Sequence, residues 1–422
     1  MDQAHPPVSR LAAELRAAGM ADVPQHFSVA RVHQQIPARV LAGIDAFIRL
    51  FDRVTTRAAW QAAMTASAPE ICRQARPEVC FFSAWDFHLP PDGAESWQLI
   101  ECNDNGSGML YAALINRVFY EVTGWTGRRS IEPPPPFAAV AERVAAMIAR
   151  EGEQFFAATP EGLLFVLDDE ESLRSGRFRD ELRLLCELCE RHGWAARLGT
   201  PGELEWDGRQ LRWRGTPVSF VVNRSTDFFW AGDVFAALRA AYASGKVYVA
   251  PNPFSYATRS DKRLLAWLST PTRDAELGIT TAERAMLGAH VPATWLLDAN
   301  NVDDLAARKA ELVFKPSHGF ASRGLLASAQ VGHARLRRLL KRGEEYVAQR
   351  RVAKCPLDSG DPQQPTLWAD LRVWAYRGER YLLSGRASCR PDALDLSPPG
   401  GWLPTYAEAA GEREPPGTGA AR

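Results

Sequence analysis

The stretch from residue 80 to residue 106, CFFSAWDFHLPPDGAESWQLIECNDNG, most constrains how this chain can fold. The aromatic and apolar run 80–89 and the second extended run 97–103 have the composition of β-strands. The four residues 90–93, Pro-Pro-Asp-Gly, are typical of a turn. The stretch therefore predicts a β-hairpin.

Two carboxylates fall opposite one another in this hairpin if the pairing is centred between Gly93 and Ala94. Asp86 then lies opposite Glu101, and Asn103 is on the same face because side chains alternate along a strand. Directly opposed residues have Cβ atoms roughly 5 Å apart, so the carboxylates repel each other unless a cation lies between them. Carboxylate and amide oxygens suit Mg²⁺ better than Zn²⁺, and Mg²⁺ held by few protein groups leaves positions for substrate phosphates. Asp86, Glu101 and Asn103 are therefore candidate metal ligands; the alternative is an exposed hairpin with scattered charges.

Length and composition limit the class of protein. The 422 residues predict about three domains at roughly 150 residues each. Lys+Arg and Asp+Glu both number 50, so the zero formal net charge gives no indication of a nucleic-acid or membrane-surface partner. No apolar run reaches the length of about 18 residues that a membrane span needs, and residues 1–20 lack the apolar core of a signal peptide. Cys186 and Cys189 form a CxxC within a predicted helix, where a buried face is favoured over zinc. These features predict a cytoplasmic protein.

The rest of the chain divides by pattern. Residues 1–75 are predicted to be mostly helical, and residues 76–135 contain the hairpin, a helix and a proline-rich boundary. Residues 136–252 alternate between helix and buried strand, which predicts a small, doubly wound α/β unit with a parallel sheet. Residues 253–406 are a second α/β region, and residues 407–422 are predicted to be a disordered tail. The overall fold class is α/β (α+β).

The carboxyl ends of strands in such an α/β unit are where function tends to lie. The predicted strand at 217–223, PVSFVVN, is followed directly by Arg224. Arg224 is therefore a candidate for binding an anionic substrate; the alternative is a solvated strand end.

The segment 311–324, ELVFKPSHGFASRG, combines a lysine with a loop of small residues. Lys315 ends a predicted strand just before Pro316, which stops regular pairing. The loop allows close backbone approach to a ligand, and its successive N–H groups can form an anion-binding concavity. A further strand is predicted after it, and an ordinary Gly-rich hairpin is the alternative. The candidate phosphate-binding residues of the loop are Ser317, His318, Gly319, Ser322 and Gly324.

A predicted strand at 344–352, EEYVAQRRV, offers a different feature. Val347 and Gln349 lie where the strand could present polar groups to the edge of a flat ring. Glu345 stands at its start, where it could hold a ribose. The alternative is a strand that belongs only to the core.

A later hairpin, LWADLRVWAYRGERYLLSGRAS, is predicted to turn at Arg377-Gly378. Asp370 and Arg372 share one face of its first strand. They are candidates for a further acid near the metal and a phosphate contact, or for an ordinary cross-strand salt bridge.

Together these segments resemble the circularly permuted ATP-grasp enzymes, which include eukaryotic-type glutathione synthetase and the synthetase domain of glutathionylspermidine synthetase. Residues 82–87, FSAWDF, look like the FxRxDF segment of that family, and residues 101–103, ECN, look like its E-x-N metal motif. The stretch around Lys262 is similar to the one carrying an ATP-contacting lysine. FKPSHGFASRG resembles the K-P and Gly-rich lid, with Lys315 on the phosphates, and YVAQ looks like the adenine-binding strand.

The resemblance implies an ATP-grasp fold in the permuted order, with the metal motif before the lid, and ATP and Mg²⁺ as cofactors. It also implies an ADP-forming carbon–nitrogen ligase, in which ATP phosphorylates the carboxylate of a small acid or peptide and an amine then displaces phosphate. One departure is Ala84, which stands where the family has an arginine that helps to bind the reacting phosphate. Arg224, Arg372 and Arg386 are the candidates to replace that arginine. A second departure is the Gly-rich lid, which has no carboxylate here, whereas glutathione synthetase has an acid in it. The alternative function is a nucleotide-binding module or degenerate homologue without turnover, which Ala84 and this lid favour.

Overall fold

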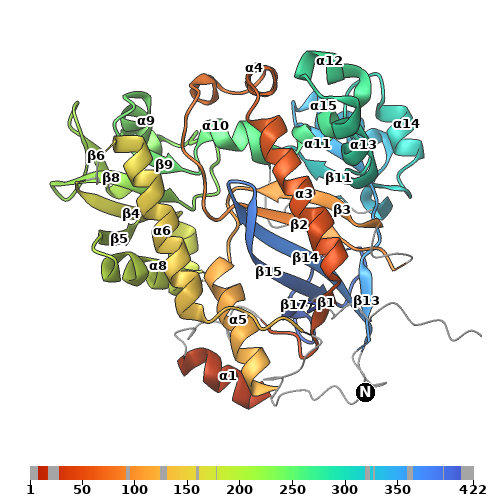
Figure 1. The fold of residues 1–422 in the computed structure, drawn as a ribbon. Helices are drawn as coiled ribbons and strands as arrows, with labels where there is room; N and C mark the ends of the chain where they lie inside the picture. The colour runs from red at the N-terminus through yellow and green to blue at the C-terminus, as the bar shows by residue number, and fades with distance from the viewer. Residues whose placement is uncertain are drawn as a thin grey trace, which may run out of the picture.

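The structure is a computed structural model that contains both helices and strands along the chain (Figure 1). It describes residues 8–17, 28–91, 96–123, 131–157, 161–176, 178–318, 324–326, 328–358, 365–392 and 394–409. Within these residues the strands form three larger sheets and one two-stranded sheet. None of the helices found there is long and apolar enough to cross a bilayer.

A large antiparallel sheet in the order β16-β15-β14-β2-β3, with β13 also pairing β14, forms the centre of the molecule. Its strands are β2 (Ala84–His88), β3 (Gln98–Asn103), β13 (Cys355–Leu357), β14 (Leu367–Tyr376), β15 (Glu379–Ser388) and β16 (Gly401–Leu403). Helix α5 (Met109–Val122) joins the core on one face, and α3 (Ala38–Thr55) joins the core on the other. α3 buries apolar residues at helical spacing, which is why its sequence forms a helix there.

The predicted hairpin register is confirmed where residues 84–86 pair with residues 101–103. Asp86 pairs with Glu101, and Ala84 pairs with Asn103. An irregularity after Asp86 shifts the pairing by one residue, so that Phe87 lies opposite Leu99. The turn residues 92–95 lie outside the described part of the chain.

The α/β unit contains a parallel sheet in the order β5-β4-β8-β9, extended by the antiparallel β7 and β6. Its strands are β4 (Leu163–Leu167), β5 (Ala195–Gly199), β6 (Leu204–Trp206), β7 (Leu211–Trp213), β8 (Thr216–Asn223) and β9 (Tyr248–Ala250). Helices α6 (Phe137–Phe156) and α8 (Arg179–Arg191) pack with one face, and α9 (Ala236–Ala243) packs with the other. The short helix α7 (Glu170–Ser175) follows β4. Cys186 and Cys189 are buried in α8 as free thiols, as the helix pattern predicts.

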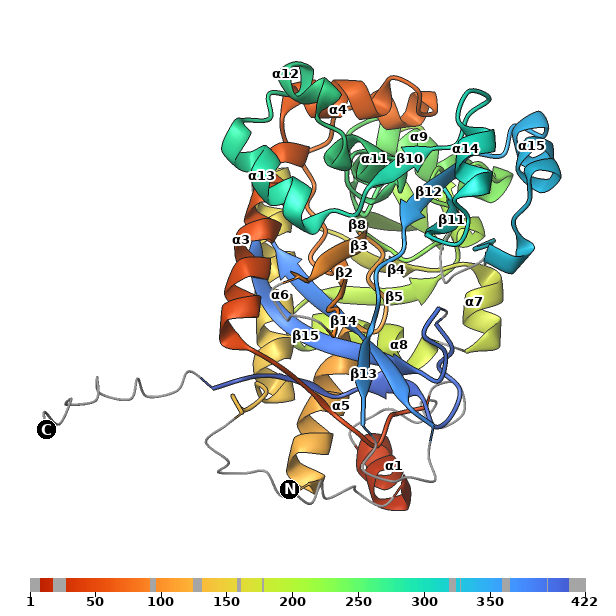
Figure 2. The same cartoon turned by 90° about the vertical axis from the view of Figure 1, so that its right-hand side faces the viewer.

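A small antiparallel sheet in the order β10-β12-β11 lies beyond the end of the large sheet (Figure 2). It comprises β10 (Thr294–Leu296), β11 (Leu312–Pro316) and β12 (Tyr346–Arg350), and packs with α14 (Val302–Ala307) and α15 (His333–Lys341). The strand predicted after the glycine-rich loop is wrong as far as the structure describes that segment. Only a single bridge forms there, between Leu326 and Phe314.

The remaining elements complete the N-terminal region and connect the sheets. They are α1 (Val8–Ala17), β1 (Gln34–Ile36), α4 (Ala58–Thr65), α10 (Pro253–Ser255), the π-helical turn Tyr256–Ser260, α11 (Arg263–Ser269), α12 (Asp274–Leu277), α13 (Thr281–His290) and β17 (Thr405–Ala407). β17 pairs with β1, and the Glu408 N–H donates to the Ile36 carbonyl. Ordered structure therefore extends into the start of the predicted tail, because backbone pairing with the N-terminal region holds it.

Candidate functional site

A cavity of about 490 Å³ lies where the large sheet, the small sheet and the carboxyl ends of β4 and β8 meet. It collects predicted site residues from segments far apart in the sequence. Those lining it are Asp86, Glu101, Asn103, Arg224, Lys262, Lys315, Gln349, Arg372 and Arg386. The long-range pairing of β2 with β14 and of β11 with β12 brings these residues together.

Asp86 is held by two arginines from the neighbouring strands of the large sheet. Arg372 lies directly opposite it, and its Nε and Nη2 donate to the two carboxylate oxygens at 2.6 and 2.7 Å. Arg386 donates through Nη2 to the same carboxylate at 2.8 Å and also to Asp370. Such bidentate pairs are among the stronger hydrogen-bonded contacts in proteins. Asp370 therefore forms a cross-strand salt bridge, but with Arg386 rather than Arg372.

The surrounding charges keep both Asp86, which is buried, and Glu101, which is half-buried, ionised. Burial opposes ionisation of Asp86, but the charges of Arg372 and Arg386 outweigh it and hold the pKa of Asp86 well below its usual range. Burial likewise opposes ionisation of Glu101, while Lys262 lowers its pKa below the usual value. Lys262 Nζ lies 3.4 Å from the Glu101 carboxylate.

Lys315 and Gln349 form a second buried polar contact on the wall of the cavity. Lys315 Nζ donates to Gln349 Oε1 at 2.8 Å. Because an ammonium group only donates, this contact fixes Oε1 on the lysine side and leaves the amide nitrogen facing elsewhere. That nitrogen is buried and has no hydrogen-bond partner among the residues that the structure describes, so it is an unused donor. Burial lowers the pKa of Lys315 to about 8, and the Glu101 charge opposes this shift.

The donor set tests whether the site fits Mg²⁺. No group of three His, Cys, Asp or Glu side chains surrounds a common point among the residues that the structure describes. Both oxygens of Asp86 already accept hydrogen bonds, and the Asn103 Oδ1 accepts one from the Asn105 N–H at 2.9 Å. Glu101 and Asn103 still line the cavity, and Mg²⁺ is commonly held by one or two carboxylates together with substrate phosphates. Glu101 and Asn103 fit a cation shared with phosphates, and the metal-binding roles of Asp86, Glu101 and Asn103 all stay predictions.

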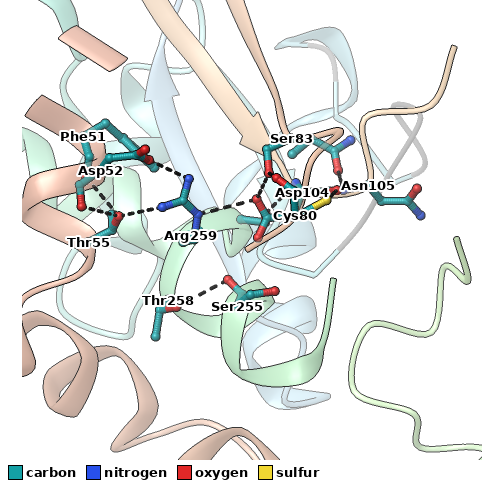
Figure 3. Close-up of polar contacts among 12 residues, drawn as sticks. Phe51, Asp52, Thr55, Cys80, Ser83, Asp104, Asn105, Ser255, Thr258 and Arg259 are labelled. Atoms are coloured by element: carbon teal, nitrogen blue, oxygen red, sulfur yellow. Dashed lines mark hydrogen bonds and ion pairs between the residues drawn. The ribbon is translucent and has the colours of Figure 1, made fainter. Parts of the chain in front are cut away.

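A partly buried ion network anchors the end of β3 next to these residues (Figure 3). Arg259, in the π-helical turn, lies between Asp104 at 3.6 Å and Asp52 of α3 at 2.7 Å. Ser83 donates to Asp104 at 2.7 Å, and burial raises the pKa of Asp104. The network ties α3 and the π-helical turn to the residue that follows Asn103. It therefore fixes the strand end that carries the candidate metal ligands.

Several residues predicted to bind nucleotide do not line the cavity. Ser317 is buried, and its N–H donates to the Glu345 carbonyl, while His318 lies 3.1 Å from the Glu345 carboxylate. The Gly324 carbonyl accepts from Tyr346, and Val347 is the buried strand partner of Lys315. Gly319 and Ser322 lie outside the described residues. The roles of all these residues stay predictions.

The cavity also includes residues that sequence reasoning missed. Asn105 and Lys354 line it, as does Asp168 at the carboxyl end of β4. Asp168 had a usable signal, because LLFVLDDE reads as a buried strand ending in acids and carboxyl strand ends tend to carry function. Lys354 lies between two short strands and had no signal of this kind.

Comparison with known proteins gives matches in structure only. No family model matches the sequence, and no curated protein matches it. The fold is similar to that of a glutathione synthetase-like effector, GSS30, from Globodera pallida, with a TM-score of 0.58, 13% identity and 91% of each chain covered. A putative gamma-glutamylcysteine synthetase from Methylobacillus flagellatus KT has a TM-score of 0.46 at 10% identity over 86% of this chain and 87% of that one. The ATP-grasp ligase PsnB, complexed with a minimal precursor, has a TM-score of 0.31 at 14% identity over 60% of this chain and 92% of that one.

The likeness to GSS30 extends over nearly the whole chain. At this identity it shows a shared fold and nothing finer. It supports the ATP-grasp-like architecture expected from the sequence. The circularly permuted order stays a prediction.

Proposed function

We propose that this chain is an ATP-dependent carboxylate–amine ligase that releases ADP and phosphate. The observation that carries the proposal is the surplus of cations at the sheet end of the cavity. The buried and half-buried cations there are Lys262, Lys315, Lys354, Arg372 and Arg386, against the carboxylates Asp86, Glu101 and Asp370. Buried charges need compensation, so this end of the cavity suits a polyanion such as a nucleoside triphosphate.

Four of these five cations, all except Lys354, have a role in the proposal that follows from their positions. Lys315 and Lys262 bind phosphate oxygens, and Gln349 offers its unpartnered amide donor to the nucleotide. Arg372 stabilises the transferring phosphoryl group, since it lines the cavity from β14, the strand that pairs with Ala84 and Asp86. Arg386 donates hydrogen bonds to both Asp86 and Asp370 and so holds these two carboxylates in place.

Glu101 and Asn103 would hold Mg²⁺ together with the phosphates. Bound there, the ion would neutralise charge on the phosphate oxygens. Asp86 would join it only after exchanging a guanidinium partner for the metal. The carboxylate of Glu101 therefore carries most of the expected metal dependence.

The reaction needs no covalent protein nucleophile. An oxygen of the acid substrate attacks the γ-phosphorus of ATP, and ADP leaves with the electrons of the broken P–O bond. The amine nitrogen then attacks the acyl carbon, a C–N bond forms, and phosphate leaves as the amine loses a proton. The contribution of the chain is positioning and preorganised positive charge, which are the main sources of catalysis in phosphoryl transfer.

A second candidate function, a nucleotide-binding module without turnover, is favoured by Ala84. Ala84 is fully buried and belongs to the apolar core that includes α5, so no phosphate-binding side chain projects from that position. The two functions differ in whether ADP is released. Screening small acids and short peptides against amines for ADP release tests this. The ligase predicts ADP only when both are added, and tight ATP binding with no ADP in any mixture supports the module.

Magnesium dependence is expected to reside in Glu101. With Mg²⁺, ATP at a hundredfold excess over its dissociation constant should stabilise the protein by about 2.7 kcal/mol. Glu101→Gln keeps the shape but removes the charge, so the part of this stabilisation that depends on Mg²⁺ should vanish. Thermal melts with ATP, with and without Mg²⁺, measure it. Glu379→Gln, an exposed glutamate at the start of β15, is the matched control and should keep the full shift. An unchanged Mg²⁺ effect in Glu101→Gln would place the metal elsewhere.

ATP affinity is expected to fall as pH rises through about 8, because burial lowers the pKa of Lys315 to about 8 and phosphate binds its protonated form. Above that pH the dissociation constant should rise by up to about tenfold per pH unit. Lys315→Arg keeps its charge throughout and should give a flat profile from pH 7 to about pH 9.5. Titrations of ATP at several pH values measure both. A flat profile in the unmodified protein would remove Lys315 from the phosphate site.

A further inference from the structure

The end of the cavity formed by the α/β unit differs in chemistry from the cationic end. Here the carboxyl ends of β4 and β8 meet the turn after β3. The Asn105 side chain donates from Nδ2 to the carbonyls of Arg224 and Ser225, at 2.8 and 3.2 Å. Ser225 in turn donates to Asp169, the residue after Asp168. Asn105 and Asp168 are thus joined through one short chain of contacts on the cavity wall.

Asn105 presents an acceptor that nothing in the described structure uses. Because carbonyls only accept, the two contacts with the Arg224 and Ser225 carbonyls identify the amide atom there as Nδ2. The other amide atom, Oδ1, therefore points away from these carbonyls. The residue is 9% exposed, and Oδ1 is buried without a hydrogen-bond partner. A buried acceptor left unpaired costs roughly 1–3 kcal/mol, so this atom points to a ligand that donates hydrogen bonds.

Asp168 adds a negative charge to the same wall. It is 4% exposed and accepts from the Asp169 N–H at 2.8 Å and from Ser172 Oγ at 2.7 Å. No described side chain forms an ion pair with it, and the nearby cation Arg224 instead lies 3.8 Å from Glu181 and over the ring of Phe82. A carboxylate whose hydrogen-bond donors are both neutral is complementary to a cationic donor.

Apolar side chains line the same cavity as these polar groups. Phe178, at the start of α8, stacks on Tyr111, and Leu394 and Leu396 come from the segment between β15 and β16. Trp402 of β16 lies over the start of α5, where a Cβ on Gly108 would be 2.1 Å from its ring. These apolar side chains would cover a hydrophobic ligand body while Asn105 and Asp168 bind its charged end.

We infer that this end of the cavity is the subsite for the amine substrate, and that the amine is a primary amine carrying an apolar or aromatic body. The inference rests on the proposed ligase function for its place in the reaction. The acceptor Oδ1 of Asn105 and the carboxylate of Asp168 bind the ammonium group, and Phe178 and Trp402 cover the body. A strongly hydrophilic amine would leave the apolar wall uncovered.

Direct binding of three probes tests the inference on the full chain without nucleotide. Phenethylamine carries both features, 2-phenylethanol lacks the charge, and ethanolamine lacks the apolar body. Ligand-observed NMR or calorimetry should give phenethylamine a dissociation constant at least tenfold lower than that of either analogue. Equal binding of 2-phenylethanol would overturn the ammonium assignment, and equal binding of ethanolamine would overturn the apolar one.

Substitutions of Asp168 and Phe178 test whether these residues of the cavity wall bind the amine. Asp168→Asn should weaken phenethylamine at least tenfold, while Glu170→Gln, an exposed neighbour in α7, should not. Phe178→Ala should weaken phenethylamine but not ethanolamine, which keeps the test usable if Asp168→Asn fails to fold. Undiminished phenethylamine binding in folded Asp168→Asn or in Phe178→Ala would overturn the subsite.

The melting shift with Mg-ATP separates this inference from the proposed function. Nucleotide stabilisation should be the same in Asp168→Asn as in the unmodified protein, because Asp168 follows β4 of the α/β unit, whereas Lys315 belongs to β11 of the small sheet. An ATP shift without selective phenethylamine binding overturns the amine subsite and leaves the nucleotide site standing. Selective amine binding without an ATP shift supports the subsite and contradicts the ligase.

Discussion

Asp86→Asn is expected to lower the free energy of unfolding by about 3–5 kcal/mol, the range for breaking a buried ion pair by removing one partner. The carboxylate is 2% exposed and accepts from two guanidinium groups. Asparagine cannot accept at both atoms, so Arg372 would be left as an uncompensated buried cation, while Arg386 keeps Asp370. Urea unfolding at pH 7 measures the loss.

Asp45→Asn is the matched control. Asp45 also binds an arginine, Arg380, through two oxygens, but both side chains of that pair are about a quarter exposed. Exposed and partly exposed pairs contribute up to about 1 kcal/mol, so this variant should lose much less. If both variants lose the same amount, the burial of the Asp86 pair is not what stabilises it.

The pH dependence of the Asp86 effect has a definite sign. Because the folded-state pKa of Asp86 is depressed, its stabilisation is fully present above the unfolded-state pKa of about 3.9 and decreases as pH falls below it. The difference between the unmodified protein and Asp86→Asn should therefore shrink below about pH 4. Added pyrophosphate should stabilise the variant more than the unmodified protein, since an anion can replace the missing charge.

The pairing within the hairpin was predictable from the sequence, but the long-range contacts of its side chains were not. A turn and a two-residue period were enough to place Asp86 opposite Glu101, because hairpin partners lie close in the chain. The cations that hold Asp86 are 286 and 300 residues away in the sequence. The sequence argument expected a metal to relieve the repulsion of the two carboxylates. In the structure, Arg372 and Arg386 compensate Asp86, and Lys262 compensates Glu101.

The part of the cavity formed by the α/β unit shows the same limit of prediction from sequence. Arg224 was found because it follows a strongly apolar strand, and Asp168 follows a similar one. Nothing in the sequence shows that the turn carrying Asn105 docks on the end of β8. That contact depends on how the large sheet and the α/β unit meet. Motif spacing carries no information about it.

Ala84→Arg is expected to unfold the protein rather than to restore a family feature. Ala84 is fully buried between Asn103 and Trp374 in the large sheet, and a Cβ on Gly106 would lie 2.8 Å from its own Cβ. The Gly106 carbonyl is also fixed by the Trp374 indole at 2.9 Å. Overpacking costs roughly 1–3 kcal/mol, and burying an unpaired cation adds several more, so the loss should exceed about 3 kcal/mol.

Ala84→Ser, which adds one atom at the same position, is the control and should lose roughly 1 kcal/mol as a small overpacking change. Urea unfolding of both variants with and without Mg-ATP measures the effect. Mg-ATP should not rescue Ala84→Arg, because the covering turn keeps position 84 away from the cavity. If Ala84→Arg instead folds normally and binds Mg-ATP more tightly, the side chain reaches the phosphates. In that case the site lacks only this one arginine, and the role assigned to Arg372 is wrong.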